Sequence, residues 1–214
     1  MNELWGFLKQ GGPLMVPILV FSVVALAVFL ERAWALQSSK VVPRDFLALI
    51  RRKVKEGRAA EAVTLCEGNP SAVSRVVAAG VRHAGRPREV IKEAFEEVGR
   101  LEVAHLGRFV EVLGTIAAVS PLLGLLGTVV GMIEVFRTVV AEVGDAAGPV
   151  NPGSLANGIW AALMTTAAGL SAAIPAFLGY KYLLSRLDRL AMEMEEASLL
   201  LLDLLSAPPP DGDA

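Results

Sequence analysis

The sequence lacks the side chains on which most metal sites and many enzymes depend. Its 214 residues hold one cysteine, Cys66, and two histidines, His83 and His105. One cysteine excludes an internal disulfide framework, and three such side chains cannot supply a spaced ligand set of the zinc type. No nucleophile, general base or cofactor motif is visible. We therefore expect a protein that is not an enzyme and that carries no metal and no cofactor.

Charge is also scarce. Asp, Glu, Lys and Arg make up 20% of the residues, against about 25% in an average soluble domain. The net charge of −2 and the pI near 5.8 leave no basic excess to neutralise phosphates, which argues against a nucleic-acid partner. Hydrophobic residues reach 54%, above the usual value of about 45–50%. This combination predicts a membrane protein that contacts the lipid bilayer.

Three long segments contain no Asp, Glu, Lys or Arg: residues 10–30, 112–133 and 146–180. A helix rises about 1.5 Å per residue, so about 20 residues cross a hydrocarbon core of ~30 Å. The third segment opens with AAGPVNPGSLANG, whose Gly, Pro and Asn residues are typical of a loop. The sequence thus predicts an all-α membrane protein with three transmembrane helices: 13–36, 112–137 and 155–184.

The basic residues predict the orientation of these helices. Residues 32–111 hold 15 of the 20 Lys and Arg residues, whereas residues 138–154 hold none. Short loops rich in Lys and Arg stay in the cytoplasm. We expect a periplasmic N-terminus over residues 1–12, a cytoplasmic helical region over residues 37–111 and a periplasmic loop over residues 138–154. The third helix then continues into the cytoplasm as a helix over residues 185–206.

A cleaved signal peptide is the competing interpretation of the first apolar segment. Ala25 and Ala27 have the spacing of a small-residue cleavage site. The leader MNELWGFLKQGG, however, carries one Lys and one Glu instead of a basic cluster, and the strong positive charge follows the apolar run. This arrangement favours an uncleaved anchor whose N-terminus lies outside.

The cytoplasmic region shows helical periodicity. From Arg88, apolar residues recur at helical spacing, and no breaker precedes the second span, so we expect one continuous rod. On the polar side of this rod, Glu96 and Arg100 have the i,i+4 spacing of an ion pair. Residues 44–80 are predicted to form two short helices, broken at Gly68-Asn69-Pro70.

The predicted C-terminal helix carries a heptad seam. Its apolar residues step by four and three along the chain: Leu183, Leu187, Leu190, Met194, Ala197, Leu201 and Leu204. The seam packs either on the cytoplasmic helices of its own chain or on another copy, and the spacing does not distinguish the two. Beyond the seam, consecutive prolines cannot continue a helix, so we expect residues 207–214 to form a disordered tail.

Small residues distinguish the second and third spans from the first. They let helix backbones approach closely in lipid, where packing and hydrogen bonds drive association. We expect these two spans to pack on each other while the first span faces lipid. The residues expected at this contact are Gly124, Gly127, Gly131, Ala161, Gly169, Ala173 and Pro175.

Hydroxyl groups in these two spans have two possible roles. They can line a polar path, or they can donate to a carbonyl one turn earlier in the same helix. No Asp, Glu, His, Lys or Arg lies within residues 112–133 or 146–180, although such a residue is the usual mark of a proton relay. The chain therefore lacks the main component of a self-sufficient proton pump. We expect Glu134 and Arg137, at the outer end of the second span, to form an ion pair instead of a relay.

Two segments resemble a known family. The run SPLLGLLGTVVGMIEVF at residues 120–136 and the run GIWAALMTTAAGLSAAIPAFLGY at residues 158–180 are similar to the MotA/TolQ/ExbB proton-channel family. The three predicted spans and the large loop resemble its TolQ/ExbB branch, whereas the MotA branch has a four-span design.

The resemblance implies a ring, typically a pentamer, in the bacterial inner membrane. The ring would surround two copies of an ExbD/TolR-like single-span partner, whose membrane carboxylate takes and releases the proton. A TonB- or TolA-like protein would pass the resulting motion to the outer membrane. The resemblance also implies that Thr128 and Thr166 face the ion path, with the adjacent Thr165 as the weaker candidate.

One position departs from the pattern of the family. Many ExbB-like members have Glu or another polar residue where this chain has Ala161, so a step that depends on that residue cannot operate identically here. The ion, H⁺ by kinship or Na⁺, and the pathway that is energised stay open. A passive oligomeric scaffold without ion conduction is the alternative function. A substrate transporter is disfavoured, because no polar or charged substrate site lies within the spans.

Overall fold

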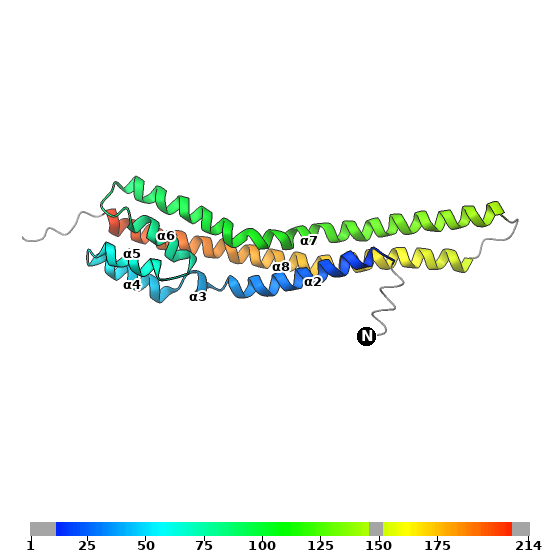
Figure 1. The fold of residues 1–214 in the computed structure, drawn as a ribbon, viewed down its shortest axis with the longest axis horizontal. Coiled ribbons are helices and arrows are strands. Elements are labelled where there is room, and N and C mark those ends of the chain that lie inside the picture. The colour runs from blue at the N-terminus through cyan, green and yellow to red at the C-terminus, as the bar shows by residue number, and fades with distance from the viewer. Residues whose placement is uncertain (1–11, 146–151, 207–214) are drawn as a thin grey trace, which may run out of the picture. The chain divides into compact units, whose positions relative to one another are not determined.

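The computed structural model describes residues 12–145 and 152–206, and the regular structure of these residues is helical throughout. In chain order the helices are α2 (Met15–Ala35), α3 (Ser38–Val41), α4 (Arg44–Lys55), α5 (Ala59–Glu67), α6 (Ala72–Val81), α7 (Arg88–Asp145) and α8 (Pro152–Ser206) (Figure 1). Among the described residues, α2, α7 and α8 are long and apolar enough to cross a membrane. The predicted all-α fold with three long apolar helices is confirmed.

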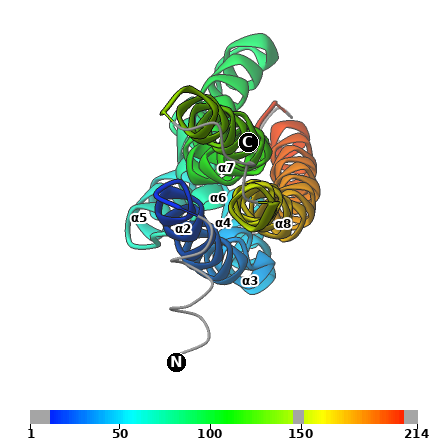
Figure 2. The same cartoon turned by 90° about the vertical axis from the view of Figure 1, so that its right-hand side faces the viewer.

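The chain forms two compact units. The first, which we name the apolar unit, combines Met1–Leu30 with Glu111–Lys181. The second, the charged unit, combines Glu31–Val110 with Tyr182–Ala214. Helices α7 and α8 contribute to both units, and within each unit their segments lie side by side (Figure 1 and Figure 2).

The apolar unit presents large apolar side chains on its outside. Leu26 of α2, Leu122 of α7 and Leu178 of α8 are all exposed, and similar side chains surround them. Such a surface is unfavourable in water but suits contact with lipid chains. Helix α2 buries few of its own residues, which agrees with its expected position facing lipid.

Helices α7 and α8 extend further than the predicted spans. Helix α7 continues to Asp145 and α8 begins at Pro152, so both ends of the segment expected to be a loop, 138–154, are helical. Charge and turn residues suggested the loop, but no proline lies between residues 122 and 145 of α7, and proline is favourable in the first turn of a helix such as α8. The middle of that segment, the first 11 residues and the predicted tail over residues 207–214 lie outside the described residues.

Residues 44–80 form parts of three helices, so the prediction of two was wrong. Gly57, with a φ of +74°, ends α4 in a Schellman motif. The N–H of Arg58 donates to the carbonyl of Lys53, and the N–H of Gly57 donates to the carbonyl of Val54, both at 3.0 Å. The predicted break at Gly68 is confirmed, because α5 ends at Glu67 and α6 begins at Ala72.

The heptad seam of α8 packs inside its own chain. Six of its seven members are buried, and only Leu204 is half-buried. Leu187 of the seam lies against Gly107 of α7, because its Cδ2 is 3.0 Å from the position that a Cβ on Gly107 would take. Of the two alternatives for the seam, the structure favours packing on the helices of its own chain.

Ion pairs join the helices of the charged unit. Arg75 of α6 forms a bidentate pair with Glu102 of α7, at 2.6 and 2.5 Å, and this hydrogen-bonded carboxylate raises the pKa of Arg75. Arg88, at the start of α7, donates to Asp203, near the end of α8, at 2.8 Å. These contacts fix the register of α7 against α6 and α8.

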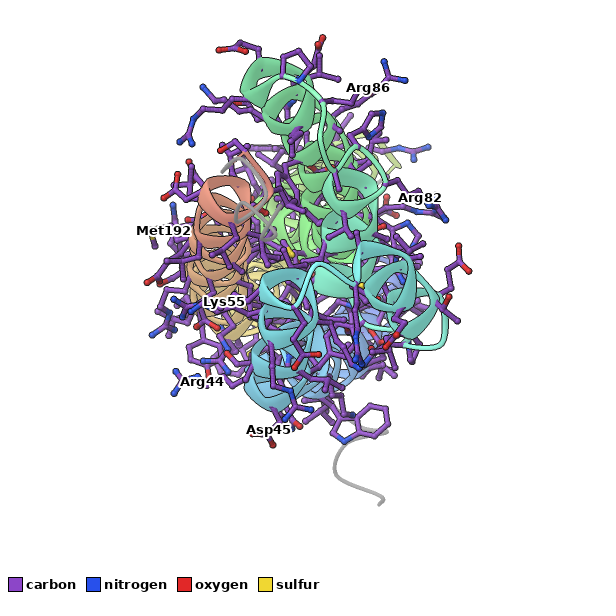
Figure 3. All side chains as sticks on the ribbon, turned by 90° about the vertical axis from the view of Figure 1, so that its left-hand side faces the viewer. Arg44, Asp45, Lys55, Arg82, Arg86 and Met192 are labelled. Atoms are coloured by element: carbon purple, nitrogen blue, oxygen red, sulfur yellow. The ribbon has the colours of Figure 1, made fainter. Side chains whose placement is uncertain are left out.

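The expected ion pair between Glu96 and Arg100 is absent from this part of the structure. Glu96 pairs with Lys92 at 3.5 Å, while the Nε of Arg100 donates to the backbone carbonyl of Glu96 at 3.3 Å. Lys92 and Arg100 each lie one helical turn from Glu96, and sequence spacing alone does not show which of them forms the ion pair. Other charged side chains, such as Arg44 and Arg82, point outward from the charged unit (Figure 3).

The contact between Gly80 and Phe95 generates a prediction for the charged unit. A Cβ on Gly80 would overlap the ring of Phe95, and this ring is only 5% exposed and cannot swing into solvent. We expect Gly80→Ala to destabilise the unit by about 1–3 kcal/mol, less the small gain in helix propensity. Thermal unfolding followed by circular dichroism in detergent measures the loss.

Gly68→Ala is the matched control for this experiment. The atoms nearest to a Cβ on Gly68 lie at 3.7 and 3.8 Å, which is ordinary contact, so its melting temperature should stay close to that of the parent. Equal melting temperatures for the two variants would contradict the described packing of Phe95.

The single cysteine generates a prediction about pH. Burial raises the pKa of the Cys66 thiol from 9.0 to about 11. Above pH 9 the unfolded chain releases this proton while the folded chain keeps it, so the free energy of unfolding should fall between about pH 9 and 11. The loss is at most about 1.4 kcal/mol per pH unit. Comparing unfolding of the parent with Cys66→Ala isolates it, and identical alkaline profiles would contradict the expected shift.

Candidate functional site

The segments of α7 and α8 in the apolar unit touch backbone to backbone. A Cβ on Gly169 would lie 2.7 Å from the carbonyl oxygen of Ser120 and 3.0 Å from the Cα of Gly124. A Cβ on Gly124 would lie 3.0 Å from the Cα of Thr166. No side chain fits between the helices here, and close approach of this kind is how small residues join helices in lipid. Gly124 and Gly169 therefore define the contact that positions the candidate site.

Other small residues extend this contact toward the C-terminal end of α7. A Cβ on Gly127 would overlap the side chain of Thr165, and a Cβ on Gly131 would lie 2.7 Å from the Cβ of Ala162. Ala162 is buried at this contact, whereas Ala161, expected there from the sequence, is half-buried and offers its carbonyl to Thr165.

The two remaining residues expected at the contact lie further along α8. Ala173 is buried in the structure, whereas Pro175 is exposed. Pro175 in α8 and Pro121 in α7 both lie inside their helices. Because proline has no N–H, the carbonyls of Ala117 and Ser171 lack the intrahelical donor that another residue would supply.

The three candidate threonines differ in burial and in hydrogen bonding. Thr165 is 2% exposed, and its hydroxyl donates to the carbonyl of Ala161 at 2.9 Å within α8. Thr166 is half-buried and donates across the contact to the carbonyl of Gly124 at 2.8 Å. Thr128 is half-buried and donates to the carbonyl of Leu125 at 2.7 Å within α7. Of the two roles considered above, bonding within the same helix is observed for Thr165 and Thr128, whereas Thr166 joins the two helices, and no contact described here tests the polar path.

The hydroxyls of Thr128 and Thr166 bond to neighbouring residues of α7. Their hydroxyls donate to the carbonyls of Leu125 and Gly124, which are consecutive residues of α7. Each hydroxyl has one hydrogen and two lone pairs, so each oxygen still accepts hydrogen bonds after its hydrogen is used. Thr128 and Thr166 therefore present acceptor oxygens within the same turn of α7. A protonated carboxyl group or a water molecule can donate to such oxygens.

The site contains no charged group of its own. The only ionisable groups that the sequence places near these segments lie at their ends, where Glu134 and Arg137 form the expected ion pair at 3.7 Å. Both side chains of this pair are well exposed. No group of three or more potential metal ligands occurs among the described residues. The arrangement can therefore accept hydrogen bonds but cannot itself take up a proton near neutral pH.

Sequence reasoning missed two residues at this contact. Ser120 is fully buried, donates to the carbonyl of Ile116 at 2.7 Å, and offers its own carbonyl to the approach of Gly169. Tyr180 covers Gly114, because a Cβ there would lie 2.9 Å from the Cε2 of the tyrosine ring. Gly114 and Ser120 were visible as small residues of the second span, but their partners in α8 depend on the register between the helices, which the sequence does not specify.

Comparison with known proteins yields a family and several relatives. The profile described as the MotA/TolQ/ExbB proton channel family matches residues 69–196. The protein named ExbB-like 1 of Synechocystis sp. is 36% identical over 185 residues, which cover 84% of this chain and 69% of that protein. The ExbB homolog of Methanothermobacter thermautotrophicus is 28% identical, over 84% of this chain and 62% of the homolog. The Tol-Pal system protein TolQ of Haemophilus influenzae is 27% identical, over 84% of this chain and 82% of TolQ. This chain thus spans less than two thirds of the Methanothermobacter protein.

The backbone contact at Gly169 generates a prediction. We expect Gly169→Ala to push α8 away from the carbonyl of Ser120 and to destabilise the apolar unit by about 1–3 kcal/mol. Ser171→Ala is the matched control, because Ser171 lies two residues away on the same helix and is exposed. Thermal unfolding in detergent measures both. A stability unchanged by Gly169→Ala would contradict the contact described here.

Proposed function

Because this chain belongs to the MotA/TolQ/ExbB proton channel family, we propose that it is an ExbB/TolQ-like subunit of an ion-driven motor in the bacterial inner membrane. On this proposal it acts without enzymatic chemistry. The proton-motive force drives the motor, which energises outer-membrane transport or envelope maintenance. The chain assembles as a ring, typically a pentamer, and its N-terminus lies in the periplasm and its C-terminus in the cytoplasm.

The observation that carries the proposal is the pair of threonine hydroxyls at a helix contact that has no charged group. The hydroxyls of Thr128 and Thr166 donate to consecutive carbonyls, at 2.7 and 2.8 Å, and leave acceptor lone pairs. A path that moves protons needs a titrating group, and this chain provides none in its apolar segments. An ExbD/TolR-like single-span partner with a membrane carboxylate supplies the group that is missing.

The hydrogen bonds suggest how the threonines treat the two states of such a carboxylate. The protonated carboxyl can donate directly to either threonine oxygen, with no rearrangement of the site. The ionised carboxylate only accepts, so a threonine must turn its hydrogen away from the helix carbonyl, which costs roughly 1 kcal/mol for a neutral hydrogen bond. The site therefore favours arrival of the neutral group and still permits its ionisation. A TonB- or TolA-like protein would transmit the motion that follows.

One observation favours the alternative of a passive scaffold. The hydroxyls of all three candidate threonines already donate to carbonyls of the chain itself. On that alternative, the threonines only stabilise the contact between α7 and α8. The two functions differ in whether the chain, together with its partner, conducts ions.

Proton flux into vesicles distinguishes the two functions. With the chain and its single-span partner co-reconstituted, we expect Thr166→Val to lower gradient-driven flux about tenfold, which corresponds to about 1.4 kcal/mol in the barrier. Thr166→Ser should largely restore the flux, because it keeps the hydroxyl. Absence of gradient-driven flux in the parent, unchanged in Thr166→Val at equal amounts of assembled protein, would support the scaffold instead, and equal flux in both proteins would contradict the role of Thr166.

Thr115→Val is the matched control for the flux measurement. The hydroxyl of Thr115 also donates to a carbonyl, that of Glu111 at 3.0 Å, but it stays within α7 and its residue is exposed. This variant loses a similar hydrogen bond without touching the contact of the two helices, so its flux should match that of the parent.

A further inference from the structure

The Lys and Arg residues of the charged unit are unevenly distributed. The chain passes between the apolar unit and the charged unit three times. We name the parts of the charged unit next to these passages the boundary segments: residues 31–42, 104–110 and 182–189. They hold five Lys or Arg and two Asp or Glu, a net charge of +3. The other described residues of the unit, 43–103 and 190–206, hold 12 and 13, a net charge of −1.

The boundary segments lie close to the surface of the membrane because they continue the apolar helices. Helices α2, α7 and α8, which are long and apolar enough to cross a membrane, each belong to both units. Trp34 is four residues beyond Leu30 on α2, and Arg108 is three residues from Glu111 on α7. These separations correspond to about 6 and 5 Å along a helix, and the headgroup layer of a bilayer is about 5–8 Å thick on each side. This spacing places Trp34 and Arg108 at the depth of the lipid headgroups.

Both positions combine an exposed aromatic ring with a cation. Trp34 is 66% exposed, and the ammonium group of Lys40 lies over its ring. Phe109 is 43% exposed, and the guanidinium of Arg108 lies 5.3 Å from the centroid of its ring. A cation is attracted to the face of an aromatic ring, and aromatic rings such as that of Trp are favourable at the interface between membrane and water. Each pair thus joins an apolar surface to a positive charge.

The positive charges of Lys40 and Arg108 are not neutralised within the part of the chain that the structure describes. Neither side chain forms an ion pair there. Of the two acidic residues in the boundary segments, Glu31 pairs with Arg32, and Asp188 pairs with neither of the two cations. An ammonium group has three N–H donors and a guanidinium has five, so both cations keep donors for an anionic group from outside.

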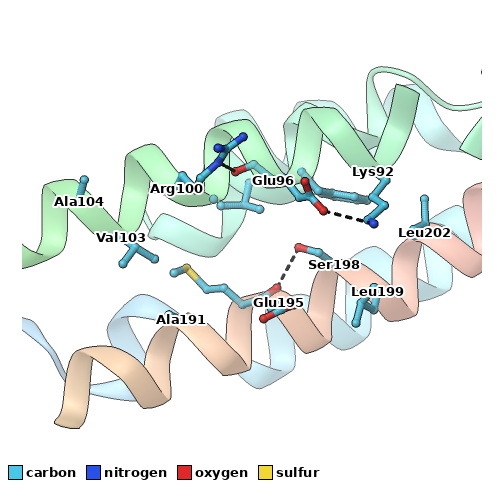
Figure 4. A pocket seen from close by; sticks show the side chains of 14 residues that line it. Lys92, Glu96, Arg100, Val103, Ala104, Ala191, Glu195, Ser198, Leu199 and Leu202 are labelled. Carbon is cyan, nitrogen blue, oxygen red and sulfur yellow. Dashed lines mark hydrogen bonds and ion pairs between the residues drawn. The ribbon is translucent and has the colours of Figure 1, made fainter. Parts of the chain in front are cut away.

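A groove between α7 and α8, elsewhere in the charged unit, lacks this excess of positive charge. The groove has a volume of about 740 Å³ and mainly apolar walls. Its charged side chains balance, because Lys92 and Arg100 are matched by Glu96 and Glu195 (Figure 4). This groove therefore offers no net attraction for an anion, and the boundary segments are the part of the unit that does.

We infer that the boundary segments bind the headgroups of anionic phospholipids in the leaflet next to the charged unit. The phosphate oxygens of the lipids accept hydrogen bonds from Lys40 and Arg108, while the rings of Trp34 and Phe109 contact the upper acyl chains. A zwitterionic lipid also carries a phosphate, but its own cation cancels the charge, so an anionic lipid is preferred. The inference goes beyond the proposed function, because it holds for any assembly of this chain in a membrane.

Quenching of tryptophan fluorescence by brominated lipids tests the inference. Trp5→Phe and Trp160→Phe leave Trp34 as the only tryptophan of the full chain. The protein is reconstituted in vesicles of equal amounts of phosphatidylcholine and phosphatidylglycerol, with bromine on the acyl chains of one lipid or of the other. Bromine quenches a tryptophan that it contacts, so the two vesicles give the relative occupancy of the lipids beside Trp34. We expect phosphatidylglycerol to be favoured about fivefold, the contribution of one basic residue near an anionic surface.

Variants of Lys40 show whether its charge causes the preference. Lys40→Ala should reduce the ratio of the two lipids to nearly one, whereas Lys40→Arg should keep it. Arg51→Ala is the matched control, because Arg51 on α4 is exposed and also forms no ion pair among the described residues, but lies outside the boundary segments. Its ratio should stay about fivefold. Raising the salt from about 0.1 to 1 M shortens the screening length from about 10 to 3 Å, so it should lower the ratio of the parent.

Phe109→Trp provides an independent measurement at the second position. In a chain in which Phe replaces all three native tryptophans, this substitution places the only reporter beside Arg108. We expect a similar preference for phosphatidylglycerol, which Arg108→Ala should remove and Arg108→Lys should keep. Circular dichroism of each variant in the same vesicles separates a lost charge from a lost fold.

Each outcome decides the inference. Equal quenching by the two brominated lipids in the parent overturns it and makes the two rings simple interfacial anchors. A preference that persists in both Lys40→Ala and Arg108→Ala overturns the assignment to these side chains. Proton flux is measured separately, so either result leaves the proposed function intact, and absence of flux in the parent leaves the lipid preference intact.

Discussion

The structure of the apolar unit depends on one contact, the approach of two helix backbones at Gly124 and Gly169. Lipid provides no hydrophobic force that would press helices together, so packing and hydrogen bonding have to hold them. With a carbonyl oxygen at 2.7 Å from a virtual Cβ, there is no room for even a methyl group. The approach also brings Thr166 within 2.8 Å of the Gly124 carbonyl, so the position of the candidate ion path follows from the same contact. The two neutral hydroxyls of the site have fixed positions only because the helix backbones that carry them are in contact.

Much of this fold follows from the sequence, because lipid imposes strong constraints. Segments without charge predicted the three apolar helices, and the periodicity from Arg88 onward predicted one continuous α7. Residues with special backbone requirements were less easily recognised. Gly57 ends α4 in the left-handed region, but it lies among charged residues that resemble a continuing helix. The predicted loop over residues 138–154 was also too long, because Gly, Pro and Asn residues are compatible with a loop but do not require one.

The candidate site was predictable in its composition but not in its register. Glycine and threonine at helical spacing indicated a packed pair of spans, and the family resemblance singled out Thr128 and Thr166. Which residue of α7 contacts which residue of α8 depends on the axial register between the two helices. That register places Ala162 instead of Ala161 against Gly131, and it gives Thr166 a partner in α7 while Thr165 bonds within α8. A shift of one residue would exchange these roles without changing the composition, so the sequence of one chain cannot decide among the registers.

The prolines at positions 121 and 175 determine where the two helices of the apolar unit are soft. Each removes one backbone hydrogen bond from its helix, the one that the carbonyl of Ala117 or Ser171 would accept. These hydrogen bonds resist bending of the helix, so kinks occur where one of them is missing. The glycine contact between Ser120 and Gly169 clamps the helices close to these weak points. Because α7 and α8 run antiparallel, both weak points lie at the same end of this contact. Any elastic deformation of the pair is therefore expected to be localised at hinges at one end of a rigid contact, and the two threonine hydroxyls lie on that contact.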